Sequence, residues 1–284
     1  MQAPGLLRSV LFVPGTRPDR FAKALAAGAD AVIFDLEDAV ESTRKDEARR
    51  AVATFLSQPA AGSVERLVRV NAAGSPWIAG DLAWLATIES RYEGIVMPKV
   101  ESPDDIAKVA RKIPSRRVMP LLETSKGIVR AAQIVTADAE IPAVLFGAED
   151  LTAELGIPRT LEGREILLAR SQVVLAAVSV GADPIDAVWA DLGRSEHLRQ
   201  DAKCARALGF TGKMAIHPDQ VKIINQEFSP TGDEVTAAKK ILAAEEAARA
   251  RGEAVFKLDG KMVDAPIIAR AKRVLALAAA RPRS

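Results

Sequence analysis

Two carboxylates that follow apolar segments are the side chains in this sequence best placed to do chemistry. Glu123 ends the apolar run Arg117 to Glu123, and Asp150 closely follows the run Pro142 to Gly147. Short apolar runs bounded by turn residues are typical of buried parallel strands. Neighbouring strands lie about 4.8 Å apart, so carboxylates at the same end of two such strands can share one cation. One or two carboxylates completed by substrate and water predict a Mg²⁺ site, with Mn²⁺ as the alternative ion.

Polar side chains also end the other apolar segments, and most of them are acidic. The two-residue period of a strand puts Met119, Leu121 and Glu123 on one face, so the Glu123 carboxylate is expected among core-facing side chains. An unpaired carboxylate in that position is costly, which favours a cation beside it. Asp38 is expected to cap the following helix. The other polar residues at segment ends are Asp35, Glu37, Arg69, Lys99, Glu149 and His217.

Two cations in this set allow more than one interpretation. Arg69 either contacts a substrate or forms an internal ion pair with Asp35 or Glu37, and the two roles are compatible. Lys99 could form a Schiff base with a carbonyl substrate. A lysine beside a metal is more often an electrostatic helper, and that role is the alternative for Lys99.

Three further residues have simpler alternatives. His217 could act as a general base, or the His-Pro pair could fix the turn between a strand and a helix. His197 lies within a charged helix and is expected to be solvated. Cys204 is predicted to lie in the core, on the apolar face of its helix.

The elements that position these residues alternate regularly between strand and helix. Segments with helix signals separate the apolar runs, for example Ser195 to Leu208, which Gly209 closes. Eight such units predict an α/β protein with a (β/α)8 TIM barrel, whose active site lies at the carboxyl ends of the strands. The alternative is an open doubly wound sheet, which usually has a Gly-rich turn after its first strand, whereas Gly15 to Pro18 contains one Gly. The eight runs are Ser9 to Pro14, Ala31 to Leu36, Arg66 to Asn71, Gly94 to Lys99, Arg117 to Glu123, Pro142 to Gly147, Pro184 to Trp189 and Gly212 to His217.

The chain continues beyond a complete barrel. We predict a catalytic barrel over residues 1–228 and a helical extension over residues 229–284. The extension contains a helix at Thr231 to Arg251, a short apolar segment at Val255 to Gly260 and a last helix from Val263 to about Ala280. It could cap the barrel or reach a neighbouring subunit.

The composition excludes several classes of protein. The chain has 284 residues, of which 49% are hydrophobic and 27% charged, with a net charge of +2. This charge is too small to indicate a nucleic-acid binder. One Cys excludes a disulfide framework, Met1 to Gly15 has no signal-peptide pattern, and no apolar run approaches the ~18 residues that cross a bilayer. We therefore expect a cytoplasmic protein that binds neither nucleic acid nor membrane.

A series of motifs in order along the chain resembles the HpcH/HpaI aldolase and citrate lyase β-subunit family. Within it, the likeness is to citrate-lyase-β-like proteins and to malyl-CoA and citramalyl-CoA lyases. No single motif is decisive, but their order and spacing together are specific. The motifs are Leu11 to Gly15, Asp35 to Val40, Val68 to Asn71, Met97 to Lys99, Glu123 to Thr124, Gly147 to Leu151 and Gly212 to Pro218.

The resemblance implies a Mg²⁺-dependent carbon–carbon lyase. Such enzymes cleave a 3-hydroxyacyl thioester into an acetyl thioester and a 2-oxo acid. It implies that Glu123 and Asp150 hold the metal and that Asp264, in the extension, is the catalytic base. It also implies a lid that closes over a neighbouring subunit, in a homotrimer or hexamer. Positions that it assigns to substrate are Arg69, Glu123, Glu149, Ile216 and His217, with Phe12, Arg17 and Lys23 as coenzyme A contacts.

The resemblance leaves three other functions open. The chain could be the citryl-acyl-carrier-protein lyase subunit of a citrate lyase complex. It could hydrolyse the thioester of malyl-CoA at the same site. It could also be a barrel without catalytic activity that serves in binding or assembly, although the presence of Glu123, Asp150 and Arg69 argues against this.

Overall fold

The alternation of apolar runs and helical segments is realised as a closed barrel in a computed structural model of the chain. The structure describes residues 7–58, 62, 64–88, 91–114, 116–137 and 139–280. Eight parallel strands pair in sequence order, and β1 also pairs with β8, which closes the sheet. The strands are β1 (Ser9–Pro14), β2 (Ala31–Asp35), β3 (Glu65–Arg69), β4 (Gly94–Met97), β5 (Arg117–Leu122), β6 (Ala143–Phe146), β7 (Asp183–Asp186) and β8 (Gly212–Ala215).

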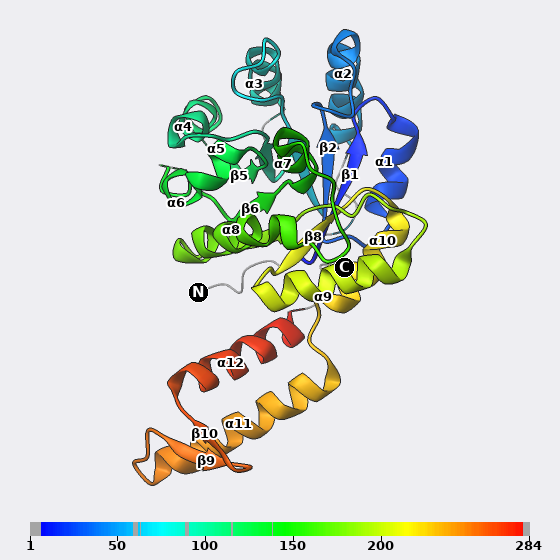
Figure 1. Cartoon of the computed structure of the whole chain (residues 1–284). Helices are drawn as coiled ribbons and strands as arrows, with labels where there is room; N and C mark the ends of the chain where they lie inside the picture. The colour runs from blue at the N-terminus through cyan, green and yellow to red at the C-terminus, as the bar shows by residue number, and fades with distance from the viewer. Residues whose placement is uncertain are drawn as a thin grey trace. The chain divides into compact units, whose positions relative to one another are not determined.

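Helices surround this sheet (Figure 1). Local signals set several of their boundaries: Pro lies in the first turn of α1, α4 and α10, and α9 ends at Gly209, whose φ is 109°. The predicted (β/α)8 barrel is confirmed, and the open-sheet alternative is wrong because β1 and β8 are paired. The helices are α1 (Pro18–Leu25), α2 (Lys45–Leu56), α3 (Ile78–Thr87), α4 (Pro103–Lys112), α5 (Ser125–Val129), α6 (Ala131–Ile134), α7 (Ala148–Leu155), α8 (Leu167–Ser179), α9 (Ser195–Leu208) and α10 (Pro218–Glu227).

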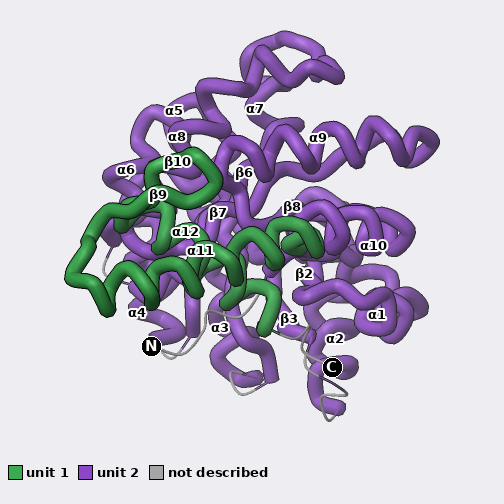
Figure 2. Tube along the Cα trace, turned by 90° about the horizontal axis from the view of Figure 1, so that it is seen from below, with its two compact units in different colours: residues 1–6, 229–282, 284 green, residues 7–228, 283 purple. Residues whose placement is uncertain are grey.

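The described residues fall into two compact units, which Figure 2 shows in purple and green. The barrel lies within residues 7–228. In the second unit, α11 (Gly232–Ala250) packs against α12 (Ala265–Ala279), and β9 (Phe256–Leu258) pairs antiparallel with β10 (Lys261–Val263). The predicted domains also include residues 1–6 and 281–284, which lie outside the described residues. None of the described helices is long and apolar enough to cross a membrane.

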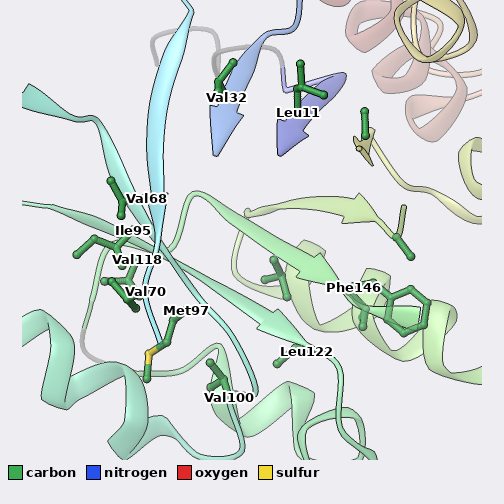
Figure 3. Close-up of a cluster of buried hydrophobic side chains, with 14 of the residues drawn as sticks. Leu11, Val32, Val68, Val70, Ile95, Met97, Val100, Val118, Leu122 and Phe146 are labelled. Atoms are coloured by element: carbon green, nitrogen blue, oxygen red, sulfur yellow. The ribbon is translucent and has the colours of Figure 1, made fainter. Parts of the chain in front are cut away.

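Side chains alternate along each strand between the barrel interior and the helices. One buried cluster fills the interior and includes Leu67, Met119, Leu121 and Met214. A larger cluster lies between the strands and the helices, and Figure 3 shows ten of its side chains with labels. Burying this apolar surface is the main favourable contribution to folding. The same alternation places Glu123, two residues beyond Leu121, toward the interior.

Four buried charges connect the last two strands to the helices outside them. Lys213 of β8 contacts Asp186 of β7 at 2.6 Å and Asp201 of α9 at 2.5 Å. Arg170 of α8 contacts the same two carboxylates at 2.9 and 2.7 Å. All four side chains are at most 3% exposed, so the two cations and two anions neutralise one another away from water.

Removing one charge from this group is expected to destabilise the barrel strongly. Lys213→Met leaves Asp186 and Asp201 with one cation between them, and breaking a buried ion pair in this way costs about 3–5 kcal/mol. Lys203→Met, on an exposed position of α9, is the matched control and should change the free energy of unfolding by less than about 0.5 kcal/mol. Urea unfolding of both variants measures the difference. Equal free energies of unfolding for the two variants would show that water reaches the four buried charges.

The structure corrects the prediction for Cys204, whose side chain is exposed. The buried face of α9 is formed by Leu198, Asp201, Ala202 and Ala205. At 3.6 residues per turn, Cys204 lies about 120° around the helix from Leu198, which places it off that face.

Candidate active site

A cavity of about 450 Å³ lies at the carboxyl ends of the strands, where the barrel fold predicts an active site. Its walls combine acids with apolar side chains. Among the described residues that line it, Arg69 is the single cation. The lining residues are Phe12, Pro14, Asp35, Asp38, Ala39, Arg69, Leu121, Glu123, Gly147, Ala148, Glu149, Asp150, Val188, Met214 and Ile216.

Glu123 lies directly after β5 and is 4% exposed, as the strand period predicts. The backbone N–H of Lys99 donates to its Oε1 at 3.0 Å. Gly147 at the end of β6 approaches it so closely that a Cβ there would lie 2.5 Å from the Glu123 Cβ. A residue without a side chain at position 147 therefore allows this carboxylate to sit between β5 and β6.

Asp150 reaches the same cavity from α7. This helix begins at Ala148, immediately after Gly147, and carries Glu149 and Asp150 in its first turn. Acidic side chains are stabilised there by the partial positive charge of the helix N-terminus. Asp150 is also 3.2 Å from the Lys99 ammonium, so one lysine links it to the loops that follow β2.

Arg69 is fixed at the wall of the cavity by acids and by an aromatic ring. Its Nε and Nη2 donate to Asp35 at 2.7 and 2.6 Å, and its Nη1 lies 3.1 Å from Glu37. The guanidinium also stacks over Phe12, 4.8 Å from the ring centre. The internal ion pair expected for Arg69 is confirmed, and it holds the guanidinium rigidly at the cavity wall.

Lys99 connects three acids that are far apart in the sequence. Its Nζ lies 2.5 Å from Glu37, 3.2 Å from Asp38 and 3.2 Å from Asp150. Burial lowers the pKa of Lys99, but these carboxylates outweigh that effect and raise it above the ordinary value. A Schiff base requires a neutral amine, so this environment opposes that mechanism. Asp38 faces Lys99, and Glu41 and Arg44 occupy the N-cap positions of the next two helices, so the capping role predicted for it is wrong.

The loop after β2 is fixed by its own hydrogen bonds. The Asp35 carboxylate accepts from the backbone N–H groups of Glu37 at 2.9 Å and Ala39 at 3.2 Å. Lys45 donates to the carbonyl oxygens of Leu36 and Glu37, both at 2.7 Å. These bonds hold the acids of the loop in place before any substrate binds, which favours a preorganised site.

The structure brings six of the predicted site residues together and places the others elsewhere. Arg17 is on the surface and pairs with Asp19 at 2.8 Å, and Lys23 is exposed on α1. His217 is the N-cap of α10, and its Nδ1 accepts from the backbone N–H of Asp219 at 3.2 Å. The turn-fixing role considered for His217 is thus seen directly. The six residues that line the cavity together are Phe12, Arg69, Glu123, Glu149, Asp150 and Ile216.

Asp264 lies in the second unit, at the start of α12. It is the N-cap of this helix, and its Oδ1 accepts from the backbone N–H of Ile267 at 3.4 Å. Pro266 occupies the first turn, as is common in helices. Its catalytic role stays a prediction.

The electrostatics of Glu123 test whether the site suits a divalent cation. Burial and the negative charges of Asp150 and Glu37 together raise the pKa of Glu123 to about 8, against the lowering effect of Arg69 and Lys99. A cation next to this carboxylate would relieve both effects. No group of three or more Asp, Glu, His or Cys in the described part of the chain could hold a metal by itself. Two carboxylates completed by water and substrate are nevertheless the usual ligands of Mg²⁺, so the residues fit this ion.

The raised pKa of Glu123 predicts how the metal-free protein responds to pH. Between its ordinary pKa and about 8, the folded protein holds a proton that the unfolded chain has lost, so the free energy of unfolding falls as pH rises. We expect Glu123→Gln to remove about 3–4 kcal/mol of the decrease between about pH 5 and about pH 8. Urea unfolding in EDTA at both pH values measures it. Glu162→Gln, at an exposed position, is the control. If the free energy of unfolding changed equally with pH in the wild type and in both variants, the prediction would be contradicted.

Sequence reasoning missed two features of the site. One is the apolar part of the cavity wall, formed by Leu121, Val188 and Met214, although the strand period already places Leu121 beside Glu123. The other is the linkage of Lys99 to Glu37 and Asp150, which has no sequence signal. It depends on the course of three separate loops and on the positive φ of 52° at Lys99.

A closed parallel barrel with an acidic cavity at the carboxyl ends of its strands defines a barrel enzyme with a site for a divalent cation. Comparison with known proteins identifies the family. Residues 8–218 match the family described as HpcH/HpaI aldolase/citrate lyase. The chain belongs to this family, whose members include carbon–carbon lyases.

Individual relatives match nearly the whole chain. A citrate lyase subunit β-like protein of Deinococcus radiodurans is 41% identical, covering 96% of this chain and 97% of its own. A (3S)-malyl-CoA thioesterase of Cereibacter sphaeroides is 36% identical, covering 96% and 95%. A mitochondrial citramalyl-CoA lyase of Rattus norvegicus is 29% identical, covering 95% and 86%.

A solved structure extends the similarity to three dimensions. The CitE protein of Mycobacterium tuberculosis, in complex with magnesium, acetoacetate and coenzyme A, superimposes with a TM-score of 0.82 at 36% identity. The match covers 97% of this chain and 99% of that one.

Proposed function

We propose that this chain is a Mg²⁺-dependent lyase that cleaves a 3-hydroxyacyl-CoA of the citramalyl or malyl type into acetyl-CoA and a 2-oxo acid. The observation that carries the proposal is Glu123, a buried carboxylate that faces Asp150 in a cavity with few cations. Such a carboxylate is costly without a metal and useful with one. The magnesium and coenzyme A in the similar CitE structure support the same assignment.

The proposed reaction breaks the bond between the carbinol carbon and the α-carbon of the thioester. A base takes the hydroxyl proton, the carbinol carbon becomes the carbonyl carbon of the oxo acid, and the electron pair of the broken bond passes to the thioester as an enolate. A proton then adds to the α-carbon of the enolate, which gives acetyl-CoA. Mg²⁺ held by Glu123 and Asp150 would supply Lewis-acid stabilisation of the oxo acid. Arg69 can donate N–H groups to the enolate oxygen, since Asp35 and Phe12 hold its planar guanidinium in place.

The base in this proposal is Asp264 of the C-terminal unit. The resemblance to related lyases suggests it, because the second unit there closes over the site of a neighbouring subunit. We therefore infer a homotrimer or hexamer in which each site is completed by another chain. His217 is a weaker candidate for the base because its Nδ1 already accepts the hydrogen bond that caps α10.

The experiment that tests the proposed function is an assay with a panel of thioesters. The protein is incubated with citramalyl-CoA, malyl-CoA and citryl-CoA in Mg²⁺, and the products are separated by chromatography. Acetyl-CoA and a 2-oxo acid support the lyase. Free CoA with intact malate would instead support the second candidate, thioester hydrolysis, which is the activity of one relative. Activity with a citryl-acyl carrier protein alone would identify a citrate lyase subunit, and no product from any thioester would favour a binding or assembly role.

Coenzyme A is expected to contact Arg17, the N-cap residue of α1, and Lys23 within this helix. Arg17→Ala and Lys23→Ala should each raise KM for the acyl-CoA by about 3- to 30-fold with a smaller change in kcat, because they bind a part of the substrate remote from the reacting bond. Arg20→Ala, at a neighbouring exposed position, is the matched control. Unchanged KM in both variants would exclude these contacts and make an acyl carrier protein the more plausible donor.

A further inference from the structure

The cavity has a chemically uneven wall that bears on the choice of substrate. Carboxylates make up the polar part of the lining, and Leu121, Val188 and Met214 form an apolar surface that we call the apolar floor. Leu121 and Met214 are each 2% exposed and belong to the cluster that fills the barrel interior, against which Val188 also packs. The floor is therefore continuous with the core and is held by it.

Position along β5 places the apolar floor directly below the metal-binding carboxylate. Leu121 precedes Glu123 by two residues on the same face of the strand, so it lies one step deeper in the barrel. Met214 is on β8 and Val188 follows β7, so the floor is formed by two strands and the segment after a third. A substituent that points from Glu123 toward the barrel interior would contact these side chains.

The candidate substrates of the proposed function differ in one substituent of this kind. Citramalyl-, malyl- and citryl-CoA share the hydroxyl, the adjacent carboxylate and the thioester. The carbinol carbon additionally carries a methyl group in citramalyl-CoA, a hydrogen in malyl-CoA and a carboxymethyl group in citryl-CoA. The group that meets the floor is thus small and neutral in two of them and an anion in the third.

Charge around the cavity disfavours the anion. Five carboxylates line it, those of Asp35, Asp38, Glu123, Glu149 and Asp150, against one guanidinium. Arg69 already donates from its Nε and Nη2 to Asp35, and its Nη1 lies 3.1 Å from Glu37, so its positive charge is already paired with two carboxylates. Lys99 is likewise paired with three acids. A carboxymethyl group on the floor would therefore be desolvated among acids without a cation of its own.

We propose that Leu121, Val188 and Met214 determine the specificity of this enzyme for a thioester that releases an oxo acid with a small uncharged side chain. This inference rests on the proposed function and assigns its substrate specificity to three residues. The methyl group of citramalyl-CoA fills apolar space that the hydrogen of malyl-CoA leaves open, and one buried methyl group changes kcat/KM by about 10-fold or more. The carboxylate of citryl-CoA should cost about 100-fold or more.

The test compares kcat/KM for citramalyl-CoA and citryl-CoA in the wild type and in Val188→Lys, which adds a cation at the half-buried edge of the floor. We expect the wild type to prefer citramalyl-CoA by about 100-fold or more, and Val188→Lys to reduce that ratio by at least about 10-fold. Val178→Lys makes the same change on an exposed position of α8, 52% exposed, and should leave the ratio unchanged. A wild type that uses the two thioesters within about 10-fold of each other would overturn the inference. So would a Val188→Lys enzyme with the wild-type ratio.

A binding measurement separates failure of this inference from failure of the proposed function. If none of the thioesters is cleaved, the proposed function is wrong. Calorimetric titration of the protein in MgCl2 with pyruvate and with freshly dissolved oxaloacetate then decides the inference. Pyruvate binding that is tighter by at least about 10-fold supports the apolar floor as the specificity element. Equal or tighter binding of oxaloacetate overturns it.

Discussion

Glu123→Gln and Asp150→Asn should each reduce kcat by at least about 1,000-fold while the barrel stays folded. Both substitutions remove a negative charge from the proposed metal site and keep the size of the side chain. The amide introduced by Glu123→Gln is neutral, as the protonated carboxyl group of Glu123 is, so the buried position should tolerate it well. Steady-state kinetics and thermal unfolding of the same samples separate loss of activity from loss of structure.

Metal removal should reproduce the effect of these substitutions in the wild type. Excess EDTA is expected to stop turnover, and Mg²⁺ or Mn²⁺ to restore it. Glu47→Gln and Asp104→Asn make the same chemical changes at exposed positions of α2 and α4 and should keep full activity. Full activity in EDTA, or borohydride trapping of a substrate on Lys99, would refute the metal hypothesis in favour of a Schiff base.

Asp264→Asn should abolish turnover almost as completely as Asp264→Ala if this residue is the catalytic base. The pair of variants is informative because Asp264 also caps α12. Asparagine keeps the capping hydrogen bond but cannot take a proton, whereas alanine loses both functions and about 1 kcal/mol of stability. An Asp264→Asn enzyme with wild-type kcat would limit the residue to capping.

Mixing two inactive variants then shows whether the site is shared between chains. Asp264→Ala and Glu123→Gln proteins are dissociated, combined and reassociated, and activity is measured against each variant treated alone. Regained activity requires a metal site from one chain and an Asp264 from another. A mixture as inactive as its components would place both groups in the same chain or remove Asp264 from the reaction.

Much of the barrel follows from local patterns in the sequence. The helix predicted at Ser195 to Leu208 has those bounds. A turn precedes Ser195, and Gly209 ends the helix. The two-residue period alone predicts that Glu123 faces the interior, and it does. Such predictions succeed because periodicity and end signals act within a few residues.

Contacts between loops that are far apart in the sequence could not be predicted from such local patterns. The bond between Lys99 and Glu37 joins residues that are 62 positions apart, and its formation depends on the path of both loops. Lys213 is fully buried in a strand, and the strand pattern gives no sign that Asp201 of α9 reaches it. The prediction for Cys204 is wrong because Cys204 lies about 120° around α9 from Leu198, outside the buried face of the helix.

The contact between Gly147 and Glu123 limits how the enzyme can change, by evolution or by design. Alanine at position 147 would put a methyl carbon 2.5 Å from the Glu123 Cβ and 2.6 Å from its Oε2. The strand or the Glu123 carboxylate would have to move. Substitution of Gly147 would therefore disrupt the metal site, although Gly147 contributes no side chain to it. A library for new oxo acids that varies the apolar floor should therefore keep glycine at position 147.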